Sequence, residues 1–345
     1  MKCGKVILIG DIDLHRFPYN GEKMKNQLFL RHFRTIFDKV IPVDVHDWKH
    51  RPWCMAVMLW QLLFNRNAKV ILSACDEHTY QLIKFLYYVR LKKNVFYWVV
   101  GGGFHEKMRR GEFERRYYGF LKMIIVQSPD MVDTLQRLGF DNVMFVPNSK
   151  PVYEVTHCGK QGIVRFAFLS RIEPTKGCGH ILECVRELNQ AGLQSRFEVT
   201  FYGKVASDYE ADFNRKVEDL PNVTYYGILD LTSAGGYGIL ADNDVFLFPT
   251  FYRNEGFPGV LIDAFIAGLP IIASDWHFNS QLIDVGRTGV IIEHDNCAEL
   301  KNAMESFINS KYYIEDMRRY CIEKAKEYDV RNVLCPQTLE RIGLL

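Results

Sequence analysis

The sequence predicts an α/β protein built from two doubly wound, Rossmann-like halves. Short apolar runs typical of buried strands alternate with amphipathic segments of helical length from residue 5 to residue 146. A polar stretch with two prolines and no periodicity interrupts the alternation at 147–162. The same alternation begins again at residue 164. We therefore expect one domain at 1–150 and a second at 163–328, each around a mostly parallel sheet.

In the first half, the run at 5–10 is apolar at nearly every position, as expected for a parallel strand buried on both faces. A helix is expected at 22–37, because Leu28, Phe29, Phe33, Ile36 and Phe37 fall on one helical face. By the same reasoning, further strands are expected at 40–45, 69–73, 95–100, 123–126 and 142–146, and further helices at 55–64, 78–89, 112–120 and 129–138.

The second half repeats the pattern. Strands are expected at 164–169, 197–203, 222–226, 244–249, 271–274 and 290–292. Helices are expected at 177–190, 209–217, 231–240, 298–309 and 312–328. A further helix should begin at Gly259 and end before Gly268, because glycine is common just after a helix and Pro270 follows it.

Composition limits the class of protein. The chain has 345 residues, of which 48% are hydrophobic, enough for two cores. No uncharged apolar run reaches the roughly 18 residues of a spanning helix, and the chain opens on a strand-like run rather than a cleavable signal. Cys3, Cys75, Cys178 and Cys184 are expected to be small buried hydrophobes in a reducing compartment. The predicted location is the cytoplasm.

Charge is distributed unevenly between the halves. Residues 1–150 carry 24 Lys and Arg against 14 Asp and Glu, whereas the remainder carries 19 against 27. A basic half indicates an anionic partner, such as a membrane surface, a pyrophosphate-linked acceptor or a nucleic acid. Basic residues mix with aromatic residues at 49–53, 90–93 and 108–118, which suits an anionic membrane surface as well as ordinary solvated helix faces. Nucleic acid is not expected, because no binding module is recognisable.

The most informative stretch is the strand–loop–helix unit at 244–270. Its polar loop ends in Glu255-Gly256, and the expected helix begins at Gly259. A helix N-terminus offers free backbone N–H groups and a positive dipole end to a phosphorylated ligand. The alternative is an ordinary α/β unit whose glycines only form turns.

Glu255 and Asp263 are separated by seven residues, and Gly-Phe-Pro follows the first of them. This pattern resembles the Glu-x7-Glu signature of the family 4 retaining glycosyltransferases, with Asp in place of the second Glu, and 264–275 is also similar to that family. The resemblance implies the GT-B fold, in which two Rossmann-like domains face a central cleft. It places the acceptor on 1–150 and the nucleotide-sugar donor on 163–328, and it implies that the tail 329–345 packs back on the first domain.

The catalytic residues that this resemblance implies are Arg171, Lys176 and Glu255. Arg171 and Lys176 lie in a loop after a strand, where two cations suit a diphosphate, although a solvated basic loop is the alternative. The resemblance makes them the donor-phosphate cations. It implies that Glu255 binds the hydroxyl groups of the donor sugar and that Asp263 binds the ribose hydroxyls. The side chain of Asp263 is shorter than that of the usual Glu.

Other residues are expected to bind substrate through the backbone or the shape of a loop. Gly21 resembles the glycine loop of the family, and the glycines around Gly102 would let the backbone approach a ligand, although both can be plain turn residues. His105 either assists proton transfer or is a surface loop residue. In the second half the expected residues are Gly203, Phe257, Gly259, Val260 and, as above, Asp263.

No cofactor and no metal are expected, because GT-B enzymes generally work without a divalent ion. Asp11-Ile12-Asp13 and Asp242-Asn243-Asp244 resemble a metal-binding Asp-x-Asp only in spelling, and both are expected to be turn or cap residues.

The predicted function is metal-independent, retaining transfer of a hexosyl-type sugar from a nucleotide-diphosphate sugar to a lipid-linked or polysaccharide acceptor. The predicted setting is bacterial surface polysaccharide synthesis at the cytoplasmic face of the inner membrane. The alternatives are a nucleotide-sugar epimerase, a phosphorylase, or a non-catalytic binding subunit with the same fold.

Overall fold

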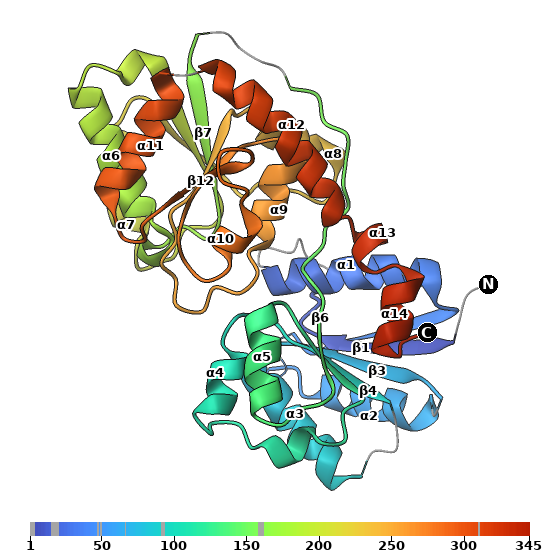
Figure 1. The fold of residues 1–345 in the computed structure, drawn as a ribbon. Helices are drawn as coiled ribbons and strands as arrows, with labels where there is room; N and C mark the ends of the chain where they lie inside the picture. The colour runs from blue at the N-terminus through green and yellow to red at the C-terminus, as the bar shows by residue number, and fades with distance from the viewer. Residues whose placement is uncertain are drawn as a thin grey trace. The chain divides into compact units, whose positions relative to one another are not determined.

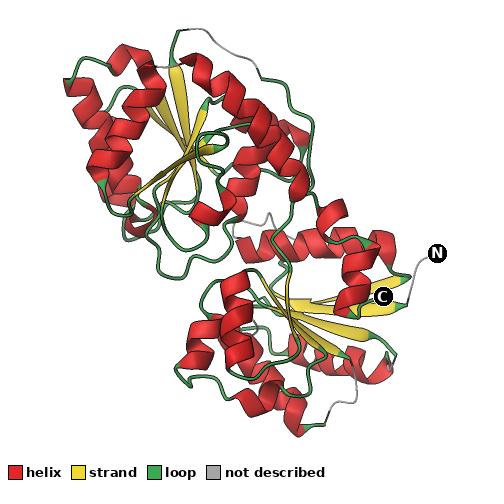
Figure 2. Cartoon of the chain, in the orientation of Figure 1, coloured by secondary structure: helices red, strands yellow, loops and turns green. Residues whose placement is uncertain are grey.

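The computed structural model describes residues 4–14, 21–46, 48, 50–65, 67–90, 94–157, 162–309 and 311–345. These form two compact units (Figure 1). Unit 1 comprises Met1–Asn148 together with Val333–Leu345, and unit 2 comprises Ser149–Asn332. Each unit is a parallel sheet with helices on both faces (Figure 2).

The sheet of unit 1 has six parallel strands in the order β2-β1-β3-β4-β5-β6. The strands are β1 (Lys5–Gly10), β2 (Lys39–Asp44), β3 (Lys69–Ser73), β4 (Val95–Trp98), β5 (Met123–Val126) and β6 (Val143–Phe145). The helices are α1 (Gly21–Ile36), α2 (Trp53–Phe64), α3 (Asp76–Tyr88), α4 (Phe104–Arg109), the 3-10 turn η1 (Arg115–Tyr118), α5 (Pro129–Arg137) and α14 (Pro336–Ile342).

Two apolar layers hold unit 1 together, one on each face of its sheet. One layer joins the inner sides of α2, α3 and α5 to strand residues such as Ile7 and Val70. The other includes Phe29 and Phe33 of α1, and the Phe29 ring lies 4.5 Å from the ring of Trp98. Helix α14 lies beside α1, where the His32 Nε2 atom is 3.2 Å from the carbonyl oxygen of Leu334 (Figure 1). The last residues of the chain are therefore part of the unit that the first residues begin.

The sheet of unit 2 also has six parallel strands, in the order β12-β11-β10-β7-β8-β9. The strands are β7 (Val164–Leu169), β8 (Phe197–Tyr202), β9 (Val223–Gly227), β10 (Val245–Phe248), β11 (Ile271–Ser274) and β12 (Gly289–Ile292). The helices are η2 (Pro174–Lys176), α6 (Cys178–Gln190), η3 (Gln194–Arg196), α7 (Glu210–Glu218), α8 (Ala234–Ala241), α9 (Gly259–Ile266), α10 (Asn279–Leu282), α11 (Cys297–Asn309), α12 (Lys311–Glu327) and α13 (Val330–Val333).

The predicted elements agree closely with this architecture, apart from one region. Five predicted strands coincide residue for residue with β1, β3, β5, β7 and β11. The helix expected at 112–120 is wrong, because only the 3-10 turn η1 forms there and α4 precedes it. Gly111, with φ of +73°, follows α4, while Tyr117 and Tyr118 of η1 are buried in the core. Short helix α10 was also not predicted.

Two of the cysteines that were predicted to be buried hydrophobes, those of α6, are buried as expected. Cys178 and Cys184 are fully buried, and burial raises the pKa of Cys178 to about 12, so that thiol stays protonated. Cys75 is only half-buried, beside the N-terminus of α3. Cys3 lies outside the described residues.

Candidate functional site

The predicted donor residues of unit 2 lie in loops that follow three neighbouring strands. Lys176 follows β7, Gly203 follows β8 and Glu255 follows β10, and these strands are adjacent in the sheet. In a parallel sheet the carboxyl ends of adjacent strands meet at one edge, which is where α/β proteins bind ligands. The sheet order therefore gathers residues that are almost 80 positions apart in sequence.

Two glycines bring these loops into close approach. Gly177 has φ of +78°, and a Cβ atom there would lie 2.2 Å from the carbonyl oxygen of Pro249. At Gly203, φ is +135°, and a Cβ atom would lie 1.8 Å from the carbonyl oxygen of Ser170. Neither position has room for a side chain, and both conformations favour glycine. The loops after β7, β8 and β10 consequently touch through their backbones.

At the centre of the site, Lys176 and Glu255 form an ion pair. The Nζ atom of Lys176 donates to Oε2 of Glu255, and both side chains are largely buried. The Thr250 hydroxyl donates to the same carboxylate oxygen over 3.2 Å, and the Lys176 ammonium lies 4.3 Å from the ring centroid of Tyr252. Charge-assisted bonds of this kind are stronger than neutral ones, so the pair is held in a fixed position.

Arg171, the other predicted cation, is placed differently. Its side chain is 67% exposed, and its Nε atom pairs with Oε2 of Glu173 at 3.2 Å. Glu173 in turn accepts a hydrogen bond from the Thr175 hydroxyl at 2.8 Å. Because exposed pairs of this kind contribute little energy, Arg171 can exchange Glu173 for another anion at small cost.

Helix α9 begins at Gly259, as predicted, and presents an uncapped N-terminus. Pro258 occupies the N-cap position and makes no side-chain cap. The N–H groups of a first helical turn have no acceptor within the helix, so those of Gly259 and Val260 suit an anionic ligand. Phe257 is 95% buried and packs against Phe278 and Tyr328, so only its backbone can face a ligand.

Asp263, the second acidic residue of the motif, is buried inside unit 2. Its Oδ2 atom accepts from Lys150 Nζ at 3.0 Å, and its Oδ1 atom accepts from the Tyr237 hydroxyl at 2.6 Å. Burial raises the pKa of Tyr237 well above its ordinary value, so the phenol remains a neutral donor. Both carboxylate oxygens thus have partners within the chain. The ribose role predicted for Asp263 stays a prediction, and the geometry gives this residue a structural role.

The residues predicted in unit 1 lie at the carboxyl ends of its strands. Gly21 is the exposed first residue of α1, and a Cβ atom there would meet nothing within 4 Å. Gly102 is half-buried between β4 and α4, next to Gly101 with φ of +86°. His105 lies in the first turn of α4, with Nε2 3.5 Å from Oδ2 of Asp130. The roles expected for these three residues stay predictions.

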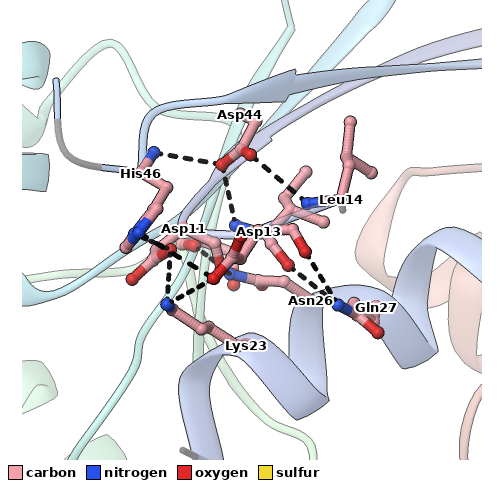
Figure 3. A network of polar contacts seen from close by, with 10 residues as sticks. Asp11, Asp13, Leu14, Lys23, Asn26, Gln27, Asp44 and His46 are labelled. Carbon is pink, nitrogen blue, oxygen red and sulfur yellow. Dashed lines mark hydrogen bonds and ion pairs between the residues drawn. The ribbon is translucent and has the colours of Figure 1, made fainter. Parts of the chain in front are cut away.

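A network of polar side chains fixes the loop after β1 (Figure 3). Lys23 Nζ binds Asp13 at 2.9 Å, and His46 Nδ1 lies 3.0 Å from Asp11. Asp44, at the end of β2, accepts from the backbone N–H of Ile12 at 3.1 Å. Asp13 has φ of +51°, as expected for a turn residue, and both carboxylates also contact the Lys23 ammonium, Asp13 at 2.9 Å and Asp11 at 4.0 Å.

The second Asp-x-Asp sequence, at 242–244, was expected to consist of turn or cap residues, and this is partly the case. Asp242 occupies the C-cap position of α8. Asp244 instead is buried and accepts from the backbone N–H of Arg165 at 2.9 Å, with Arg318 3.6 Å away. Among the described residues, no group of three or more His, Cys, Asp and Glu side chains is arranged to hold a metal ion. Within that same part of the chain, no helix is both long and apolar enough to cross a membrane.

Comparison with known proteins agrees with this geometry. The family model described as "Glycosyl transferases group 1" matches residues 164–310, which cover the loops after β7, β8 and β10. Most of unit 2 therefore matches a group 1 glycosyltransferase domain. The chain as a whole has the GT-B fold. It aligns over 99% of its length with all of HepE from Anabaena, solved in complex with UDP, with a TM-score of 0.73 and 14% identity.

Two curated relatives match at lower coverage. The chain is 21% identical over 243 residues to a D-inositol 3-phosphate glycosyltransferase of Paenarthrobacter aurescens, covering 65% of this chain and 58% of that protein. It is 22% identical over 150 residues to the putative colanic acid biosynthesis glycosyltransferase WcaL of Salmonella typhimurium, covering 40% of this chain and 34% of that protein. The chain thus spans well under two thirds of the length of these relatives.

Sequence reasoning missed four residues of unit 2 that contact the residues of the motif. Thr250 and Tyr252 contact the Lys176–Glu255 pair, and Lys150 and Tyr237 bind Asp263. The only sequence signal was the position of Thr250 and Tyr252 in the loop between β10 and Glu255. Lys150 and Tyr237 lie in other segments, and only the packing of unit 2 brings them to α9.

In unit 1 of this glycosyltransferase-like chain, Glu22 is an unusual carboxyl group. Burial, with the nearby Asp11 carboxylate adding to it, raises the pKa of Glu22 to about 7. Its Oε1 atom is buried without a hydrogen-bond partner in the described structure. The folded chain therefore holds a proton on Glu22 that the unfolded chain releases near pH 4.5.

We expect the stability of the chain to fall as pH rises from about 4.5 to 7, because ionised Glu22 is disfavoured in the folded state. Glu22→Gln should remove this part of the pH dependence. It should leave the free energy of unfolding unchanged at pH 4.5 and raise it by about 3 kcal/mol at most at pH 8. Urea unfolding of both proteins at the two pH values measures the difference. The exposed Glu112→Gln is the control, and equal effects of the two variants would contradict the assignment.

Proposed function

We propose that the chain is a retaining glycosyltransferase that moves a hexosyl-type sugar from a nucleotide-diphosphate sugar to a glycan or lipid-linked acceptor. The observation that carries the proposal is the Lys176–Glu255 pair, held by Thr250 at the ligand-binding edge of a group 1 domain. The UDP bound by HepE and the colanic acid named for WcaL are consistent with such a donor and such an acceptor. The proposed setting is polysaccharide synthesis at the cytoplasmic face of the membrane.

In the proposed reaction, the bond between the anomeric carbon and the diphosphate oxygen breaks, and a bond from that carbon to an acceptor hydroxyl oxygen forms on the same face. The acceptor proton passes to the departing diphosphate, so no protein base is needed. Negative charge grows on the diphosphate as the bond breaks. Lys176, the exposed Arg171 and the N-terminus of α9 are the groups proposed to stabilise that charge.

Glu255 is proposed to hold the donor sugar. A carboxylate accepts hydrogen bonds from sugar hydroxyls, and the Thr250 hydroxyl and Lys176 ammonium hold this one in place. Sugar and diphosphate are joined in the donor, so adjacent Lys176 and Glu255 can bind adjacent parts of one molecule. The positive groups named above are proposed to take the place of a divalent metal.

Assaying the chain with UDP-, GDP- and ADP-linked hexoses tests the proposal. A donor that binds only the folded state raises the thermal midpoint, which selects the donor to use. With that donor, release of nucleotide diphosphate should depend on an added glycan or lipid-linked acceptor and persist in EDTA. NMR of the product should show the anomeric configuration of the donor.

Other results identify the alternatives. Conversion of one nucleotide sugar into another without acceptor indicates an epimerase, and dependence on inorganic phosphate indicates a phosphorylase. Donor binding without turnover against any glycan or lipid-linked acceptor indicates a binding subunit. Inversion at the anomeric carbon, or loss of activity in EDTA, would overturn the corresponding part of the proposal.

A further inference from the structure

Helix α2 of unit 1 departs from the amphipathic pattern of the other surface helices. Its twelve residues include no charged side chain. Three of them, Cys54, Met58 and Leu62, are buried toward the sheet. Its outer side remains in solvent although it is equally apolar, with exposed fractions between 39% and 67% for Trp53, Val57, Leu59, Trp60, Leu63 and Phe64.

This outer side, which we call the α2 face (Trp53, Val57, Leu59, Trp60, Leu63 and Phe64), is large. Trp53, Trp60 and Phe64 are each more than half exposed. At roughly 200 Å² per aromatic side chain, they alone leave on the order of 350 Å² of apolar surface, and three aliphatic side chains add to it. The rings of Trp60 and Phe64 lie 3.9 Å apart, so the surface is continuous. Exposed apolar patches of this size mark protein or membrane interaction sites.

Helix α3 lies on the same face of the sheet as α2, and both contribute inner residues to one core layer (Figure 1). The last turn of α3 and its C-cap also leave apolar and aromatic groups exposed, and Tyr87 and Tyr88 contact Tyr117 of η1. Tyr87, Tyr88 and Val89 are 40–65% exposed. Exposed aromatic side chains therefore occur on both helices that cover this face of the sheet.

Cationic groups flank these apolar residues. The Arg51 guanidinium lies 5.8 Å from the ring centroid of Trp53. Arg90 is exposed directly after Val89. Residues 1–150 together carry a net charge of +10. An apolar centre that is rich in tryptophan and has a cationic margin matches the headgroup region of an anionic bilayer, where aromatic rings and Arg or Lys side chains are favoured.

We infer that the α2 face docks unit 1 on an anionic lipid surface. Helix α2 lies in the plane of the interface, with Trp60, Leu63 and Phe64 inserted below the headgroups and Arg51 and Arg90 contacting lipid phosphates. At 1.5 Å per residue its twelve residues span about 18 Å, too short to cross a bilayer, so the attachment is peripheral and reversible. This inference does not depend on the activity proposed above.

Flotation with vesicles tests it, using the full chain at 0.1 M NaCl. Wild-type protein should float with vesicles of 30% phosphatidylglycerol in phosphatidylcholine, and binding should weaken at least fivefold in 0.5 M NaCl. Trp60→Gln with Leu63→Gln should reduce the partition coefficient at least tenfold without changing the thermal midpoint, because both side chains are exposed. Val285→Gln in unit 2 is the matched control, because Val285 and Leu63 are each 67% exposed.

The depth of tryptophan insertion and the oligomeric state of the chain distinguish a lipid surface from other partners of the α2 face. Lipids brominated near the headgroup should quench wild-type tryptophan fluorescence, and quenching should fall in Trp60→Phe. Equal flotation of wild type and the double variant would overturn the inference, as would absence of flotation with any vesicle. A wild-type dimer in light scattering that becomes monomeric in the double variant, with no vesicle binding, would assign the α2 face to a second copy of the chain.

Discussion

Lys176→Met is expected to lower kcat by about 10²- to 10³-fold with the preferred nucleotide sugar. That is the range observed when one preorganised group that stabilises transition-state charge is removed. The ammonium of Lys176 is buried against Glu255 and Tyr252, where water screens its charge poorly. Steady-state release of nucleotide diphosphate, compared with the wild type at saturating donor, measures the loss.

A double variant separates this catalytic loss from a loss of stability. Lys176→Met alone leaves the Glu255 carboxylate without its cation and should also lower the free energy of unfolding. Adding Glu255→Gln removes the uncompensated charge and should recover most of that stability, while activity stays low. Recovery of activity together with stability would show that the pair is structural, and Lys176→Met with near-normal kcat would refute the site.

Asp263→Ala is expected to destabilise unit 2 by about 3 kcal/mol. The substitution leaves the Lys150 ammonium and the Tyr237 hydroxyl without their common acceptor. Breaking a buried pair costs roughly 3–5 kcal/mol, and the lower figure applies because Lys150 is 16% exposed and can reach water. Urea unfolding followed by circular dichroism measures the change.

Two further variants identify the source of that loss. Tyr237→Phe removes only the hydroxyl and should cost about 1–2 kcal/mol. Asp212→Ala removes a carboxylate from an exposed ion pair on α7 and should leave the unfolding midpoint unchanged. If Asp263→Ala raised KM for the donor without altering stability, the ribose role would gain support and the structural role would fail.

The helices, the strands and the order of the motif residues could be predicted well from the sequence, because these features depend on local patterns. Strands such as β7 and β11 are continuous apolar runs, and the start of α9 at Gly259 follows from its spacing and its C-terminal Gly268. The loop after β7 and the loop after β10 were also expected to face one ligand. Strands β7 and β10 are adjacent in the sheet of unit 2, and the shared ligand stays a prediction.

What the sequence did not predict depends on packing between distant segments. Asp263 was expected to contact the ligand because of its position in the motif. That position carries no information about Lys150, which lies 113 residues away and binds the Asp263 carboxylate. Gly203 was expected near a ligand, but only the three-dimensional structure shows that the Ser170 carbonyl occupies the space of its missing side chain. The outward half of α2 was unpredictable as well, because a helix apolar on all sides is normally buried.

The return of Val333–Leu345 to unit 1 affects how the chain folds during synthesis. Unit 2 is continuous in sequence, so it can fold as soon as its last residue has been made, as domains generally do. Unit 1 begins earlier in the sequence but lacks α14, with its buried Leu339 and Ile342, until residues 336–342 have been made. Of the two units, unit 1 is therefore begun before unit 2 and completed after it. Until then, the side of its sheet that carries α1 remains partly uncovered, and a nascent chain stalled before residue 333 would present that surface to chaperones.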